Sequence, residues 1–260
     1  MATEQIVPVA STTRPGARKA SAFSRFLVKY FYFCMSLLIA AVVIYGFSHT
    51  VDQNLIHATP PRPWILWAHG IVFSGWLAFF IFQSALVRTH HVKVHKLTGW
   101  FGVVLGVLIP VLGILTAIIM HRFIFSHFHA AAVALPPNGA NNTFFSIQTS
   151  DILLFTVFFW LAIVWRKKPE FHRRLVLVAT IALTSAGFGR WPMISHHWFY
   201  AAVDALILLG IARDVIVTRR IHIVYRYALP AFVICQIFAV QIWLRQPAWW
   251  VHVTNAIILG

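Results

Sequence analysis

Charged side chains are scarce in this chain, and acidic ones are the rarest. Of 260 residues, 10% are charged and 60% are hydrophobic, while Asp and Glu together number 6. A soluble domain has about a quarter charged residues and under half apolar ones. A water-soluble fold of this size has too little interior to hide so many apolar side chains. The composition therefore indicates a protein for which lipid is part of the solvent.

Cysteine is nearly absent, and short catalytic motifs are missing. Cys34 and Cys235 lie inside apolar runs without a C-x-x-C, so we expect small buried hydrophobic residues that say nothing about the redox compartment. The chain has no G-x-S-x-G elbow, no P-loop and no dinucleotide fingerprint. His90 and His91 are adjacent, but they have no cysteine and few acids nearby, so no metal site is expected.

Long apolar runs are present instead. A helix needs about 20 residues to cross the hydrocarbon core. Barrel strands are only ~10 residues long and alternate in polarity, which these runs do not. The sequence predicts an all-α polytopic membrane helix bundle of about seven transmembrane helices, of which the fifth is short. The predicted spans are Phe26–Phe47, Trp64–Val87, Leu97–Met120, Phe144–Trp165, Leu175–Phe188, Trp198–Val217 and Tyr225–Leu244.

The distribution of bases gives an orientation. The net charge is +15, and with the N-terminus inside, 17 of the 21 Lys and Arg fall on the inner side and 4 on the outer side. This asymmetry predicts a cytoplasmic N-terminus and an outer C-terminus. The gaps between the runs are too short to form a folded basic surface, so we expect no nucleic-acid partner. The expected partner is the lipid bilayer, with a membrane-protein partner or a homodimer as further options.

Three regions follow from this division. Residues 1–25 are expected to be a disordered basic cytoplasmic tail, with an organelle transit sequence as the alternative. Residues 26–245 are expected to be the seven-helix transmembrane bundle. Residues 246–260 are expected to be a short interfacial C-terminal tail, because Trp249 and Trp250 fit an aromatic belt. The longest internal loop is predicted on the outer side, from His121 to Thr143.

Two segments carry a family resemblance. VKVHKLTGWFGVVLG (92–106) and KPEFHRRLVLVATIAL (168–183) resemble segments of uncharacterised bacterial multi-pass inner-membrane proteins of about this length. The similarity is clearest over 64–113 and 166–192, about a third of the chain. It implies a multi-pass location in the cell inner membrane and no reaction. A fainter likeness, His followed by Arg at a helix start, is to small membrane proteins associated with haem-copper oxidase assembly. It supplies no catalytic residue.

Ionisable residues inside the predicted spans are candidates for a site, because each costs about 2.5–3.5 kcal/mol on insertion scales. The topology places four of them towards the outer leaflet, where they are expected to form a polar cluster. One role for such a cluster is a site for a ligand, a proton or a cofactor. The alternative is a structural clasp between helices. The four are His69, Asp151, Arg190 and Asp204, with His121, His196 or His197 at the edge.

The 14 histidines raise the alternative of a haem. Bis-His haem needs two imidazoles from facing helices at one depth. The candidate haem ligands are His69 with His121 on the outer side and His95 with His172 on the inner side. The alternative for the inner pair is that each is a solvated residue at a helix start.

Gly102 and Gly106 form a G-x-x-x-G motif in the third run. Small residues at this spacing let helices approach closely, so the motif predicts packing within the bundle, with a homodimer face as the alternative.

Three functions remain open at this point, and the sequence does not decide whether the protein is an enzyme. The first is a binding, assembly or structural membrane component. The second is a haem- or quinone-linked electron carrier. The third is a small proton-linked transporter that uses Asp204 and Asp151.

Overall fold

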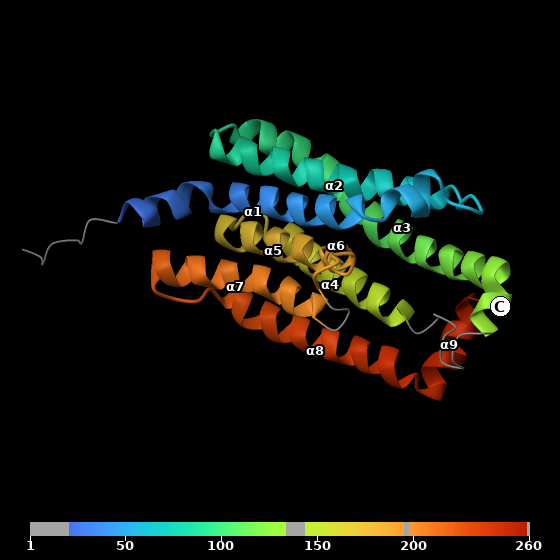
Figure 1. The fold of residues 1–260 in the computed structure, drawn as a ribbon. Coiled ribbons are helices and arrows are strands. Elements are labelled where there is room, and N and C mark those ends of the chain that lie inside the picture. Colours follow the sequence, from blue (N-terminus) through green and yellow to red (C-terminus); the bar gives the residue numbers. More distant parts are fainter. Residues whose placement is uncertain (1–20, 134–143, 195–197, 259–260) are drawn as a thin grey trace, which may run out of the picture.

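The computed structural model describes residues 21–133, 144–194 and 198–258, and every regular element in these ranges is helical (Figure 1). In chain order the elements are α1 (Ala22–Ser48), the short π-helix η1 (Asp52–Ile56), α2 (Ile65–Arg88), α3 (Val92–Val133), α4 (Phe145–Val164), α5 (Pro169–Ala182), α6 (Ser185–Phe188), α7 (Phe199–Thr218), α8 (Ile223–Arg245) and α9 (Ala248–Ile258).

Five of the described helices are long and apolar enough to cross a membrane. They are α1, α2, α4, α8 and the part of α3 from Val92 to His127. The protein is therefore an all-helical chain suited to a lipid bilayer, as its composition predicts. Helix α7 is 20 residues long, but it contains three charged residues, Asp204, Arg213 and Asp214.

The long helices pack side by side along one common direction (Figure 1). Helix α1 packs on α2, α2 on α3, α3 on α4 and α4 on α8, while α5 packs on α4 and α7 on α8. At one end, on the left in Figure 1, α2 and α7 end and α3, α5 and α8 begin. We call this the basic end, because Lys93, Lys96, Lys168, Arg173 and Arg220 lie there.

Aromatic side chains fill the centre of the bundle. The Trp76 ring on α2 packs edge to face on Phe155 and Phe159 of α4, with centroids 5.3 and 5.6 Å apart. Its indole N–H donates to the Thr180 hydroxyl of α5 over 3.3 Å. This donor needs a partner in an apolar interior, so one buried tryptophan joins three helices.

Several predicted boundaries need correction. Helix α1 begins at Ala22, so residues 22–25 are helical rather than part of the predicted tail, and residues 1–20 lie outside the described residues. Helix α3 does not stop at Met120 but continues to Val133, which makes the first half of the predicted outer loop helical. Its 42 residues span about 63 Å, twice the ~30 Å hydrocarbon thickness. The rest of the loop, 134–143, lies outside the described residues.

The fifth and last segments also differ from the prediction. The run Leu175–Phe188 is divided into α5 and the one-turn helix α6, and Figure 1 shows α6 nearer the middle of the bundle than its right-hand end. The predicted C-terminal tail contains helix α9, which packs on α3. The Arg122 guanidinium fixes it by donating to the carbonyls of Ile258 and Ile257 over 2.6 and 3.0 Å.

The glycines of the G-x-x-x-G motif face other helices of the same chain. A Cβ on Gly102 would lie 2.4 Å from the Phe79 ring of α2, and one on Gly106 would lie 2.1 Å from the Phe159 ring of α4. Both positions therefore serve packing within the bundle.

Candidate functional site

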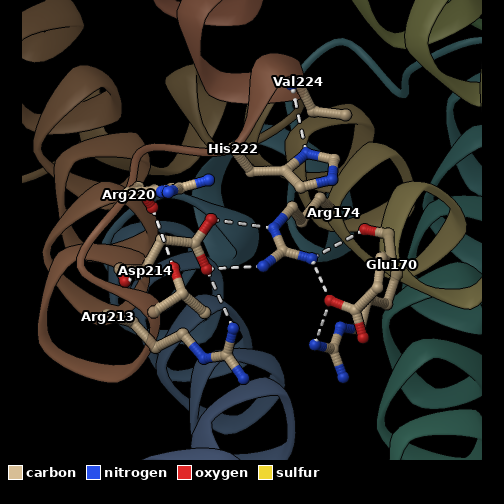
Figure 2. Close-up of polar contacts among 9 residues, drawn as sticks. Glu170, Arg174, Arg213, Asp214, Arg220, His222 and Val224 are labelled. Atoms are coloured by element: carbon tan, nitrogen blue, oxygen red, sulfur yellow. Dashed lines mark hydrogen bonds and ion pairs between the residues drawn. The ribbon is translucent and has the colours of Figure 1, made fainter.

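A buried ion pair joins α5 to α7 at the basic end (Figure 2). The Arg174 guanidinium donates from Nε and Nη2 to the two carboxylate oxygens of Asp214, over 2.9 and 2.6 Å. The Arg174 side chain is 2% exposed, and that of Asp214 is fully buried. Parallel N–H bonds of this kind are among the strongest that a carboxylate accepts, and breaking one partner leaves the other charge buried.

Three further charges extend this pair. Arg213 donates from Nη1 to Asp214 Oδ1 over 2.8 Å. On α5, Arg174 Nη1 also donates to the carbonyl and carboxylate of Glu170 over 2.8 and 2.7 Å, and Arg173 donates to the same carboxylate over 2.5 Å. We call these five residues the ionic cluster; they contribute three positive and two negative charges.

The local sequence explains how α5 positions the three residues that it contributes to the ionic cluster. Lys168 is extended, as a residue before proline must be, and Pro169 occupies the first turn of the helix, where its missing N–H has no cost. Glu170 then lies three and four residues before Arg173 and Arg174, which is the spacing of neighbours on a helix surface.

The charges around Glu170 affect its titration. Partial burial raises the pKa of this carboxyl, but the hydrogen bond and charge of Arg174, together with Arg173, outweigh burial. The net result is a pKa below the usual value of 4.5, so Glu170 is ionised at neutral pH.

Four donors around the ionic cluster have no hydrogen-bond partner among the described residues. They are the hydroxyls of Tyr32 and Tyr225 and the Nε–H groups of Arg173 and Arg213. All four atoms are buried. A buried donor left unpaired costs about 1–3 kcal/mol, and four at one place are unusual in a folded protein.

The two tyrosines belong to the same neighbourhood as the arginines. The Tyr32 ring on α1 lies 5.0 and 5.6 Å from the guanidinium carbons of Arg173 and Arg213. Tyr225 on α8 has no exposed surface, and its hydroxyl lies against Gly210 of α7, where a Cβ would approach it to 2.5 Å. Gly210 is one helical turn before Asp214, so its missing side chain brings the Tyr225 hydroxyl to the cluster.

His222 borders the same region (Figure 2). It is the N-cap of α8, and its Nδ1 accepts the backbone N–H of Val224 over 3.2 Å. Its ring packs edge to face on Phe171, with centroids 4.7 Å apart. Burial first, and then the positive charge of Arg174, lower the pKa of His222 below the usual 6.5, which keeps Nδ1 free to accept this bond.

The candidate inner haem ligands lie near each other at this end. The rings of His95 on α3 and His172 on α5 have centroids 6.3 Å apart and planes at 74°. Nδ1 of His172 is 2.9 Å from the carbonyl of Ala162, whereas Nδ1 of His95 is buried without a partner among the described residues.

The two predicted acids of the outer half have separate partners. Asp151 on α4 accepts hydrogen bonds from the hydroxyl of Ser185 at the start of α6 and from that of Tyr200 on α7, the latter over 3.1 Å. Asp204 on α7 accepts from the Gln236 amide of α8 over 3.1 Å.

The other two residues of the predicted cluster, His69 and Arg190, make different contacts. His69 stacks on Phe73 with centroids 3.9 Å apart. Arg190 donates to the carbonyl of Ala186 over 2.5 Å, and its guanidinium lies 4.2 Å from the centre of the Phe47 ring. Arg190 and His69 are close enough to interact electrostatically. In the described chain, however, no hydrogen bond or ion pair joins any two of the four predicted cluster residues.

The remaining candidates are placed as follows. His121 on α3 is buried, with Nδ1 2.7 Å from the carbonyl of Ala117 and its ring edge to face with Phe145. These contacts of His121, the other candidate outer haem ligand, are therefore with different residues from those of His69. His196 and His197 lie outside the described residues. Among the described residues, no group of three or more His, Cys, Asp or Glu is placed to hold a metal ion.

Sequence reasoning missed Asp214 and treated Arg174 and Arg213 only as topology markers. A signal existed, because Asp214 is one of only six acids and falls inside the predicted run Trp198–Val217. Asking for the cation partner of every acid in an apolar run finds Arg213 next to it, but the pairing with Arg174 depends on how α5 and α7 are rotated against each other.

No family model, curated protein or solved structure matches the chain.

Proposed function

We propose that this protein is a multi-pass inner-membrane binding protein that holds an anionic group, either a free phosphate or the phosphate of a lipid headgroup, at its basic end. In this proposal the chain crosses the membrane seven times, with the N-terminus in the cytoplasm and the C-terminus outside. The five apolar helices, the length of α7 and the one-sided distribution of bases support this topology. The inner membrane is inferred from the family resemblance.

The observation that supports anion binding is the surplus of buried donors. The ionic cluster has one more cation than acid. The two arginine Nε–H groups and the two tyrosine hydroxyls have no hydrogen-bond acceptor within the part of the chain that the structure describes. Phosphate oxygens accept several such bonds at once, and arginine binds phosphate well because its donors are planar and fixed. An anion bound there removes the cost of the unpaired donors and the excess positive charge together.

A structural clasp is the competing explanation. Arg174 and Asp214 alone satisfy each other and connect α5 to α7, which a clasp requires. A clasp does not need the unpaired hydroxyls of Tyr32 and Tyr225, since phenylalanine fills the same space without an unsatisfied polar atom. The hydroxyls therefore favour a ligand.

Thermal unfolding in detergent tests the proposal. A ligand that binds only the folded state raises its stability in a saturable way. We expect inorganic phosphate or short-chain phosphatidylglycerol to raise the unfolding temperature relative to chloride and phosphatidylcholine at equal ionic strength. If phosphate acts alone, the source is a free anion, and if only phosphatidylglycerol acts, the source is a lipid.

The matched variants are Arg213→Gln and Arg219→Gln. Arg213 is buried in the ionic cluster, whereas Arg219 is exposed beyond the end of α7. Stabilisation by the anion is expected to disappear in the first variant and to persist in the second. Absence of any saturable effect in the wild type, or equal effects in both variants, rejects the proposal.

A haem-linked electron carrier is the second candidate, because His95 and His172 approach each other from two helices at one depth. The purified protein, expressed with added haem, should then show a Soret band that is lost in His172→Ala. A spectrum without this band rejects the haem.

A further inference from the structure

The Asp151 carboxyl is partly buried where α4, α6 and α7 meet, and no cation pairs with it among the described residues. It lies on α4, and its two oxygens accept hydrogen bonds from Ser185 and Tyr200. No ion pair with Asp151 occurs in the described residues. An ionised carboxylate in such a place costs several kcal/mol that two neutral donors offset only in part. The uncharged acid avoids this cost.

The groups that face Asp151 are neutral. Tyr200 approaches from α7, Ser185 from α6 and Cys235 from α8, where the thiol is close enough to interact electrostatically with the carboxyl. Ser150, next to Asp151 on α4, adds a third hydroxyl, 3.2 Å from that of Tyr200. None of these groups carries a positive charge that would hold the Asp151 carboxyl in its ionised form.

Hydroxyls can donate and accept, so the same atoms satisfy both protonation states. In the charged state, Ser185 and Tyr200 each donate to one carboxylate oxygen, as the structure shows. In the neutral state, Asp151 donates its own proton to the oxygen of Tyr200, while Ser185 continues to donate to the other carboxyl oxygen. Tyr200 then turns its hydrogen to Ser150, whose hydroxyl in turn donates to the carbonyl of Ile147 over 2.9 Å.

We propose that Asp151 is a reversible proton-binding site inside the membrane, with Ser185, Tyr200 and Ser150 as a hydroxyl shell that is satisfied whether the proton is bound or released. This role is separate from the anion site, because the ionic cluster shares no residue with it. Loss of anion binding therefore leaves the proton site intact, and the reverse also holds.

Labelling with dicyclohexylcarbodiimide tests the site on the intact protein. This apolar reagent reacts with protonated carboxyls in apolar surroundings, and mass spectrometry of peptides locates the adduct. We expect an adduct on Asp151 that forms faster as the pH falls. Asp204→Asn serves as the matched control, since it removes another intramembrane acid and should leave the adduct on Asp151 unchanged.

A second variant separates the hydroxyl shell from a merely buried acid. Tyr200→Phe removes one donor to the charged state, so labelling of Asp151 should continue to higher pH than in the wild type. The proposal is overturned if the folded wild type forms no adduct on Asp151 at any pH, or if Tyr200→Phe leaves the pH profile unchanged. It is also overturned if Na⁺ slows labelling at constant pH where choline does not, because the site then holds a metal cation.

Discussion

Asp214 is the residue on which the ionic cluster depends most. It accepts hydrogen bonds from both Arg174 and Arg213 and is fully buried. Asp214→Asn removes the acid that pairs with Arg213 and leaves Arg174 with only the exposed Glu170 as a counter-charge. Breaking a buried pair in this way costs about 3–5 kcal/mol. We expect a loss of this size in the free energy of unfolding, measured with denaturant in detergent.

Glu170→Gln is the matched control for this prediction. The Glu170 side chain is 57% exposed, so solvent screens its pairs with Arg173 and Arg174, and the loss should stay within about 1 kcal/mol. Equal losses in Asp214→Asn and Glu170→Gln would show that burial does not set the strength of the cluster.

His222 gives the protein a pH-dependent helix cap. Because its pKa lies below the usual 6.5, the unfolded chain binds the proton more readily than the folded one. Stability is therefore complete above about pH 6.5 and falls as the pH drops from there through the lower pKa of the folded state. Protonation also removes the Nδ1 acceptor of the Val224 N–H.

His222→Asn should remove this pH dependence, since asparagine caps helices well and does not titrate. We expect unfolding temperatures of wild type and variant to agree above pH 7 and the wild type to fall further by pH 5. Glu170 affects stability in a separate and lower pH range, because its pKa lies below 4.5 and its stabilising charge is lost only as the pH falls below that value. Parallel pH profiles for the two proteins would contradict the assignment.

At the scale of elements, α1 and α6 are in backbone contact. A Cβ on Gly46 would lie 2.2 Å from the carbonyl oxygen of Gly187, which no rotamer change relieves. The indole of Trp191, just after α6, also donates to the Val42 carbonyl of α1 over 3.1 Å. This close approach holds the short α6 in the bundle.

Gly46→Ala should therefore destabilise the protein by about 1–3 kcal/mol, the usual cost of overpacking. Gly70→Ala is the control, because nothing lies within 4 Å of its Cβ position and alanine favours a helix by about 1 kcal/mol. Unfolding temperatures of the two variants should move in opposite directions. If Gly46→Ala is neutral, the helices are further apart than described.

The elements also show how far sequence alone predicts this fold. Apolar length predicts α1, α2, α4, α7 and α8 within a few residues, because a lipid interior allows only helices. It fails for α9, which is short, and for residues 121–133 of α3, which extend past the predicted run. It also fails at 183–184, where α5 gives way to α6 inside a run predicted to be one helix.

The candidate site was less accessible to prediction than the fold. Asp151 and Asp204 stand out in sequence because acids are rare in apolar runs, and the structure gives each a hydrogen-bond partner. Their expected association with His69 and Arg190 depends on helix rotation, which composition does not determine. The same limit hid the partnership of Arg174 with Asp214 across α5 and α7.

At the scale of the whole molecule, an odd number of spans places the two ends of the chain on opposite sides of the membrane. Seven spans predict that a tag at the N-terminus is protected in intact cells and that one at the C-terminus is accessible from outside. Cysteine-accessibility labelling of the tags checks this. Two ends in one compartment would require an even number of spans and would contradict the proposal that the basic end faces the cytoplasm.

The central claim is that the unpaired donors at the basic end bind an anion, and Tyr225→Phe tests it most directly. Tyr227→Phe, on the same helix but 72% exposed, is the control. Affinity for inorganic phosphate and for short-chain phosphatidylglycerol is measured by calorimetric titration, alongside the unfolding temperature without ligand. We predict that Tyr225→Phe weakens binding of the active ligand about tenfold or more while the unliganded protein becomes no less stable, because a buried unsatisfied hydroxyl is removed. Unchanged affinity in Tyr225→Phe, or loss of stability without loss of binding, would contradict the account.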